Sequence, residues 1–175
     1  MASTQQSTIR YAATLSDLAI IRTLFTAYAS SLSVDLSFQN FSAELSSLPG
    51  LYAPPTGALL LVVTSTDEAV GCIGLRPLSS CPSTKVCEIK RLYCNPSSRG
   101  LGIGRALVER VIKEAEDMGY EEMRLDTLAQ MEGARKLYAS LGFEEMTAYY
   151  ETPLEKMKFL RKKLGSAKKE TLSLG

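Results

Sequence analysis

Three glycines behind an arginine form the stretch of this sequence best suited to binding a ligand. Residues 99–111 read RGLGIGRALVERV, with glycine at every second position from 100 to 104. Residues without a β-carbon let a ligand approach the main chain, and the first free N–H groups of a helix attract an anion. Arg99 or Arg105 can add charge-assisted hydrogen bonds. The stretch therefore predicts a phosphate-binding loop at the start of a helix.

Three kinds of loop compete to explain these glycines: a structural turn, a dinucleotide loop and a coenzyme A pyrophosphate loop. A P-loop is excluded, because Gly104 is followed by Arg105 and Ala106 instead of Lys and then Ser or Thr. A dinucleotide loop would explain Asp126, roughly 20 residues further on, but Arg105 or Leu107 occupies the position of its third glycine. The pattern that remains is R-x-x-G-x-G, and on these residues alone it leaves both the structural turn and the pyrophosphate loop open.

The residue types present also limit the chemistry that the chain can perform. It contains no histidine, which removes every histidine-based triad or general base. Proton transfer must then fall to carboxylates, tyrosines, lysines or thiols. The cysteines show no C-x-x-C spacing, so no zinc site, other metal site or redox pair is predicted, and reduced thiols are expected at Cys72, Cys81, Cys87 and Cys94.

The pattern of apolar residues predicts the elements that position this loop. Residues 33–56 form a long irregular connection and are a candidate lid over a substrate, with a short helix near 40–48. Alternating or branched apolar runs predict strands at 8–12, 58–65, 69–78, 85–94, 121–128, 143–150 and 157–164. Helical spacing predicts the other helices at 14–32, with Thr14 or Ser16 as N-cap, at 102–118 and at 132–142. The helix at 102–118 should bury Ile103, Ala106, Leu107, Val111, Ala115 and Met118.

Length and composition predict one globular domain. The 175 residues suit a single domain, assigned to 1–164, followed by a tail at 165–175 without an apolar pattern. The net charge of +1 argues against a nucleic-acid partner. The chain has neither an apolar span of ~20 residues nor a signal-peptide layout, so no membrane partner and a cytoplasmic location are expected.

Two motifs and the order of elements resemble the GCN5-related N-acetyltransferase (GNAT) family. The likeness covers roughly residues 8–163 and is strongest in EIKRLYCNPSSRGLGIGRALVE and ARKLYASLGFEE, and agreement of both motifs weakens the reading as a simple turn. The resemblance implies an α+β, three-layer fold: a mixed, mostly antiparallel sheet of six to seven strands with helices on both faces. It also implies an acetyl-CoA-dependent N-acetyltransferase that works by direct attack in a ternary complex.

The resemblance assigns residues to the donor, acetyl-CoA. The acetyl-pantetheine arm is expected along the strand before the loop, at Leu92, Tyr93 and Cys94. The pyrophosphate is expected on the loop and helix start, at Arg99, Gly100, Leu101, Gly102, Ile103, Gly104 and Arg105. Met131 departs from the family, which commonly has an asparagine there that binds the pantetheine arm.

Two further positions match catalytic residues of the family. Glu88 matches the glutamate general base of histone-acetylating members; the alternative is a surface ion pair with Lys90 or Arg91. Tyr138 matches the tyrosine general acid, which protonates the coenzyme sulfur; the alternative is an ordinary core tyrosine. An ordered water could also serve as the base.

The expected acceptor is the primary amine of a small molecule, such as an amino acid. Its pocket should be formed by residues 33–56 and 148–154, with Phe38 and Tyr149 among the aromatic side chains. Arg76 or Arg91 would bind a carboxylate on the acceptor. Two other functions stay open: acetylation of proteins or peptides, and a non-catalytic sensor of acyl-CoA. A homodimer is compatible with the sequence.

Overall fold

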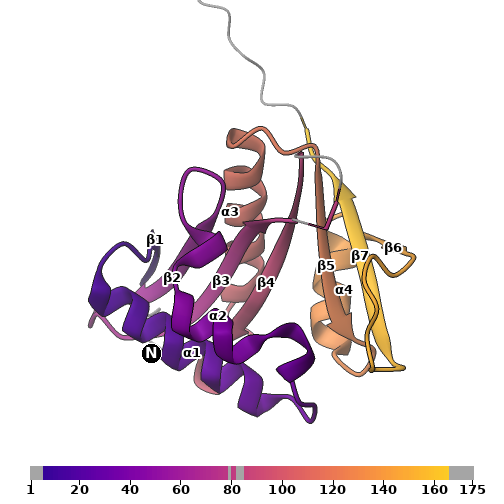
Figure 1. The fold of residues 1–175 in the computed structure, drawn as a ribbon. Helices are drawn as coiled ribbons and strands as arrows, with labels where there is room; N and C mark the ends of the chain where they lie inside the picture. Colours follow the sequence, from indigo (N-terminus) through magenta and orange to yellow (C-terminus); the bar gives the residue numbers. More distant parts are fainter. Residues whose placement is uncertain (1–5, 79, 82–84, 166–175) are drawn as a thin grey trace, which may run out of the picture.

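The computed structural model describes residues 6–78, 80–81 and 85–165, and its centre is a seven-stranded sheet in the order β1-β2-β3-β4-β5-β7-β6 (Figure 1). β4 pairs with β5 in parallel, and the other neighbouring strands are antiparallel. The strands are β1 (Ser7–Tyr11), β2 (Ala58–Thr64), β3 (Ala69–Pro77), β4 (Val86–Cys94), β5 (Glu122–Leu128), β6 (Glu144–Met146) and β7 (Met157–Lys163). The predicted tail lies outside the described residues except for Gly165.

Helices cover both faces of the sheet. In Figure 1, α1 (Leu15–Ser31) and α2 (Phe41–Ser47) lie in front of it, and α3 (Ile103–Asp117) and α4 (Glu132–Ser140) lie behind. Within the described residues, three 3₁₀ turns join the elements: η1 (Ser37–Gln39), η2 (Gly50–Tyr52) and η3 (Pro96–Ser98). The expected α+β class, with a mixed and mostly antiparallel sheet between two layers of helices, is confirmed.

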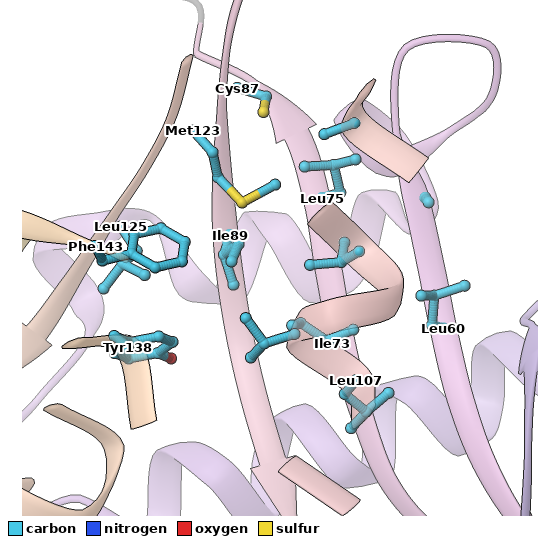
Figure 2. Packing of buried hydrophobic residues seen from close by; sticks show 14 of the residues in the cluster. Leu60, Ile73, Leu75, Cys87, Ile89, Leu107, Met123, Leu125, Tyr138 and Phe143 are labelled. Carbon is cyan, nitrogen blue, oxygen red and sulfur yellow. The ribbon is translucent and has the colours of Figure 1, made fainter. Parts of the chain in front are cut away.

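Alternation along the central strands divides the core in two. Leu59 and Leu61 of β2 pack with Ile21 and Phe25 of α1, whereas Leu60 joins the cluster on the other face of the sheet. Figure 2 shows that second cluster, which runs from Leu60 through β3 and β4 to Leu125, Tyr138 and Phe143. The sheet is therefore buried on both faces at its centre, where β2 has no exposed residue.

β4 and β5 separate along their length, and this opening is the feature on which the site depends. They pair at Val86–Glu88 with Glu122–Arg124 and no further, although both strands continue (Figure 1). Arg91 has φ +58°, and the register of β3 with β4 shifts between Cys72 and Gly74. This β-bulge bends β4 away from β5.

Several predicted boundaries needed correction. The strand expected at 143–150 ends at Met146, because Tyr149 and Tyr150 turn to pack edge-on against Phe159, with ring centroids 5.2 and 5.1 Å away. In α3, Ala106 is exposed and Val108 is buried instead, since the stripe facing the sheet follows 103, 107, 108, 111 and 115. Thr14 is the N-cap of α1 and forms a capping box with Asp17.

Candidate active site

The glycine loop requires glycine for its backbone conformation. Gly100 and Gly102 both have φ +78°, and a β-carbon on either would meet no atom within 4 Å. Leu101 between them is exposed. The first hydrogen bond of α3 runs from the Ala106 N–H to the Gly102 carbonyl. The N–H groups before that bond have no carbonyl of an earlier turn to donate to and can receive an anion; they belong to Ile103, Gly104 and Arg105.

The two arginines of the loop take different positions. Arg99 donates from Nε to the Cys94 carbonyl at 3.3 Å, which folds it back over the end of β4. Arg105 is turned toward α4, where it donates to Ser140 Oγ at 2.7 Å and also pairs with Glu109 at 3.2 Å. Arg99 thus faces the opening between the strands, and Arg105 joins the two helices behind the sheet.

Two hollows follow the opening from the glycine loop inward, and they share Tyr28, Leu92 and Met131. The outer one has a volume of about 320 Å³ and includes Tyr93, Cys94 and Arg99 in its wall. The inner one, of about 40 Å³, lies between β4 and β5 and includes Lys90, Asp126 and Tyr138. The strand residues expected to hold the pantetheine arm therefore line one hollow, and Met131 lies on its path.

Tyr138 is both a core residue and a wall of the inner hollow. Tyr138 is 5 % exposed, and its ring packs edge-on against Phe143 with the ring centroids 5.6 Å apart. Figure 2 shows the two rings next to each other. The Tyr138 hydroxyl makes no hydrogen bond to any of the described residues. Burial raises the pKa of Tyr138 well above its ordinary value, so the phenol stays protonated and can act as a proton donor.

Glu88 is buried and lines a third and larger pocket. Its Oε1 lies 2.7 Å from both Nε and Nη2 of Arg76, the residue opposite it on β3. Its Oε2 accepts a hydrogen bond from the Tyr149 hydroxyl at 3.2 Å and lies 4.0 Å from Lys90 Nζ. Glu88 is 3 % exposed, so its ion pairs with Arg76 and Lys90 are buried and do not lie on the sheet surface that the alternative assumed.

This third pocket has a volume of about 430 Å³ and lies between α2 and the sheet. It has the size of a small-molecule site, and its wall combines aromatic rings with charged groups. Phe38, Tyr149 and Arg76, which the sequence reasoning assigned to the acceptor, all line it. The other charged and tyrosine side chains that line it are those of Glu44, Tyr52, Glu88, Lys90 and Tyr150.

Arg91 does not line that pocket; the structure engages it elsewhere. Its guanidinium forms a bidentate pair with Glu44 of α2, at 3.2 and 2.6 Å, and donates to Gln39 at 2.8 Å. The Phe41 ring lies over it, with the centroid 5.0 Å away. Burial opposes the charge of Glu44, but Arg91 outweighs it and lowers the pKa of the Glu44 carboxyl. The expected lid is therefore fastened to β4 by an ion pair.

Lys90 and Asp126 are functional candidates that the sequence reasoning missed. Lys90 Nζ lies 2.5 Å from Asp126 Oδ1, and Gln39 donates to the other carboxylate oxygen at 3.1 Å. Burial opposes ionisation of Asp126, but the Lys90 ammonium outweighs it and holds the pKa of that carboxyl below its usual range. One signal was available: Glu88 and Lys90 are two apart on a strand and so share a face.

The described residues carry neither a helix long and apolar enough to cross a membrane nor a group of three His, Cys, Asp or Glu side chains able to hold a metal. The cysteines are free, and burial raises the pKa of the Cys72, Cys87 and Cys94 thiols.

Comparison with known proteins gives a consistent result. The family model described as the acetyltransferase (GNAT) family matches residues 21–143. An uncharacterized N-acetyltransferase of Schizosaccharomyces pombe is 37% identical over 145 residues, covering 83% of this chain and 87% of that protein. One of Dictyostelium discoideum is 30% identical over 189 residues, covering 76% and 88%.

Solved structures share the fold at low sequence identity. A GNAT-family acetyltransferase of Staphylococcus aureus aligns with a TM-score of 0.74 at 19% identity, over 91% of this chain and 100% of that one. A phosphinothricin acetyltransferase of Sinorhizobium meliloti, in complex with acetyl-CoA, aligns with a TM-score of 0.71 at 18% identity, over 93% and 90%. These likenesses confirm the predicted fold.

Proposed function

This chain belongs to the GNAT acetyltransferase family and transfers acetyl groups from acetyl-CoA, and we propose that its acceptor is a small primary amine that also carries a carboxylate. The observation that supports this acceptor is the pocket of about 430 Å³ beside the inner hollow. Its size suits an amino acid or related amine, and its charged groups can bind both ends of such a molecule.

The glycine loop fits the diphosphate of the donor. Its positive φ angles at Gly100 and Gly102 turn the chain sharply into α3, and the space at the β-carbon position of both glycines is open. The helix dipole adds attraction for a negative charge. From this loop, the two hollows along β4 give the pantetheine arm a path toward Tyr138.

Glu88 and Tyr138 can perform the two proton transfers. As the amine nitrogen bonds to the acetyl carbon, Glu88 accepts the proton that the nitrogen loses, with a water as relay. As the bond from that carbon to sulfur breaks, Tyr138 gives its proton to the sulfur, so that the products are an amide and free coenzyme A. The raised pKa of Tyr138 keeps this proton available at neutral pH.

Arg76 is the group suited to the acceptor carboxylate. Its Nε and Nη2 are used by Glu88, while its Nη1 makes no hydrogen bond with the described part of the chain. The end of the guanidinium formed by Nη1 and Nη2 can therefore bind a carboxylate through two parallel hydrogen bonds. Arg91 has no such capacity, since Glu44 and Gln39 engage all three of its nitrogens.

The donor and the acceptor are tested in sequence. Acetyl-CoA at about 100 times Kd should add about 2.7 kcal/mol of stability and raise Tm by roughly 5 to 10 °C, while NAD and ATP should not. Coenzyme A release is then measured with amino acids and with the matching amines that lack the carboxylate. We expect turnover of the carboxylate-bearing member of a pair. Arg76→Lys keeps the charge beside Glu88 and should raise KM for that member about tenfold, through the loss of one hydrogen bond.

Each result has a distinct meaning. Turnover of peptides alone, or a KM unchanged in Arg76→Lys, would contradict the proposed acceptor. Binding of acetyl-CoA without turnover of any amine or peptide would favour a sensor instead of an enzyme.

A further inference from the structure

The Lys90 ammonium lies where the inner hollow and the acceptor pocket meet. Lys90 lines both of them, and it is 5 % exposed. Its side chain reaches from β4 to Asp126 on β5 and so bridges the two strands beyond their last paired residues. Figure 2 shows Ile89 and Leu125, which precede Lys90 and Asp126 in sequence, on the two sides of this opening.

This buried ammonium has unused hydrogen-bonding capacity. It carries three N–H donors, and the described residues supply one hydrogen-bond acceptor, Asp126. Glu88 Oε2, at 4.0 Å, is too distant for a hydrogen bond. The Tyr150 ring lies 5.8 Å away and offers its face instead of an acceptor atom. A buried cation with free donors, between the places for donor and acceptor, points to an acceptor atom on a ligand.

The ammonium is also held in position. Asp126 is fixed through its second oxygen by Gln39, whose own carbonyl oxygen accepts a hydrogen bond from Arg91. A charged group that is fixed before the reaction needs no rearrangement when charge develops next to it.

We propose that Lys90 is a catalytic residue that donates a hydrogen bond to the acetyl carbonyl oxygen, with Asp126 and Gln39 as positioning residues. This rests on the proposed function. As the amine nitrogen adds to the carbonyl carbon, the π electron pair moves onto the oxygen, and Lys90 stabilises that negative charge without giving up its proton. The pair returns as the bond to sulfur breaks. The same cation disfavours a second one nearby, so it helps the acceptor amine to stay neutral.

The test needs no acceptor, because the bond to be polarised is already present in acetyl-CoA. Infrared difference spectra are recorded with acetyl-CoA labelled and unlabelled with ¹³C at the carbonyl, bound to the wild-type chain and to Lys90→Met. We expect the carbonyl band at lower wavenumber on the wild-type chain than in water, and we expect Lys90→Met to lose that shift while retaining Kd. Lys113→Met, an exposed site on α3, is the matched control.

Kinetic and second-variant measurements complete the test. With any accepted amine, Lys90→Met should lower kcat about 10²- to 10³-fold at unchanged KM for acetyl-CoA, as loss of one donor to a developing oxyanion does. Asp126→Asn should lose part of the band shift. Lys90→Leu, which also has no hydrogen-bond donor, replaces Lys90→Met if the latter does not fold.

Equal band positions on the wild-type and Lys90→Met chains would overturn the inference, as would loss of acetyl-CoA binding in a folded Lys90→Met. Both outcomes leave the proposed function intact. That function fails separately, when the wild-type chain itself does not bind acetyl-CoA.

Discussion

Glu88 and Tyr138 show how the neighbours of a residue determine what it can do. Sequence reasoning, through the family likeness, singled out both residues. Tyr138 packs in the hydrophobic core and also lines the inner hollow, so a role in the core does not exclude a role as proton donor. Of the two neighbours that the sequence reasoning named for Glu88, Lys90 lies 4.0 Å away, but it missed the closer partner, Arg76 on β3. Cross-strand register decides that pairing, and register depends on the bulge at Arg91, which the sequence pattern did not indicate.

Tyr138→Phe tests the proton donor at the scale of a single atom. The substitution removes the hydroxyl and keeps the ring that packs on Phe143. We expect kcat to fall about 10²-fold with KM for acetyl-CoA unchanged, because the hydroxyl acts in the transition state. The raised pKa also predicts that wild-type activity shows no alkaline loss from Tyr138 below pH ~10. Steady-state thiol release from pH 6 to 10 measures both; an unchanged kcat would exclude this role.

Among the elements, the predicted helices and strands lie close to those observed, with β6 as the main exception. Helical spacing and capping residues are local signals, so α1 and α3 could be placed well. The bulge could not be predicted, because its positive φ lies at Arg91 instead of at a glycine, the residue that usually marks such a conformation. As a result, the side chains of Lys90 and Arg91 both lie on the face of the sheet that α2 covers. In a regular strand, two consecutive side chains would point to opposite faces.

Gly102→Ala tests the loop as an element, with Gly119→Ala as its control. Both glycines have positive φ, +78° and +85°, and both have open space at the β-carbon position. Each substitution should lower the free energy of unfolding by about 1 to 2 kcal/mol through backbone strain. Only Gly102→Ala should also weaken acetyl-CoA binding, by tenfold or more, because Gly119 follows the far end of α3. Calorimetric titration and urea unfolding separate the effects; equal Kd values would show that the loop does not bind the donor.

For the whole molecule, the mixed and mostly antiparallel sheet of seven strands and the helices on both its faces agree with what the family resemblance predicted. Composition and periodicity supported an α+β domain, but they could not provide the strand order. The acceptor pocket and the Lys90–Asp126 pair are assembled from η1, α2, β3, β4, β5 and the turn before β7, so most of their contacts join residues far apart in sequence. Such contacts are not encoded in any local pattern.

Asp17→Asn tests how much one carboxylate contributes to the stability of the whole fold as the pH falls. Burial alone would raise the pKa of Asp17, but hydrogen bonds from the main chain of Thr14 and Ala13 and from Arg10 hold it at about 2. The unfolded value is ~3.9, so Asp17 stabilises the fold by about 2 kcal/mol above that pH, and this is lost as pH falls toward 2.

Unfolding free energies measured from pH 2 to 7 should therefore converge for wild type and Asp17→Asn at the acid end. Asp117→Asn, at an exposed site paired with Lys113, should follow the wild type throughout. A constant difference between wild type and Asp17→Asn at every pH would contradict the assignment.

The separation of β4 from β5 leaves a gap between two neighbouring strands of the sheet. Beyond Glu88, the main chain of β4 that faces β5 has no strand partner among the described residues. Buried peptide groups need partners, and the pantetheine arm contains two amide groups that can provide them. A pantetheine arm bound along β4, as proposed, would then complete the hydrogen bonding of this strand as well as deliver the acetyl group. Release of coenzyme A would leave these main-chain groups of β4 without their partners again. Each turnover would therefore break and re-form hydrogen bonds in the middle of the sheet.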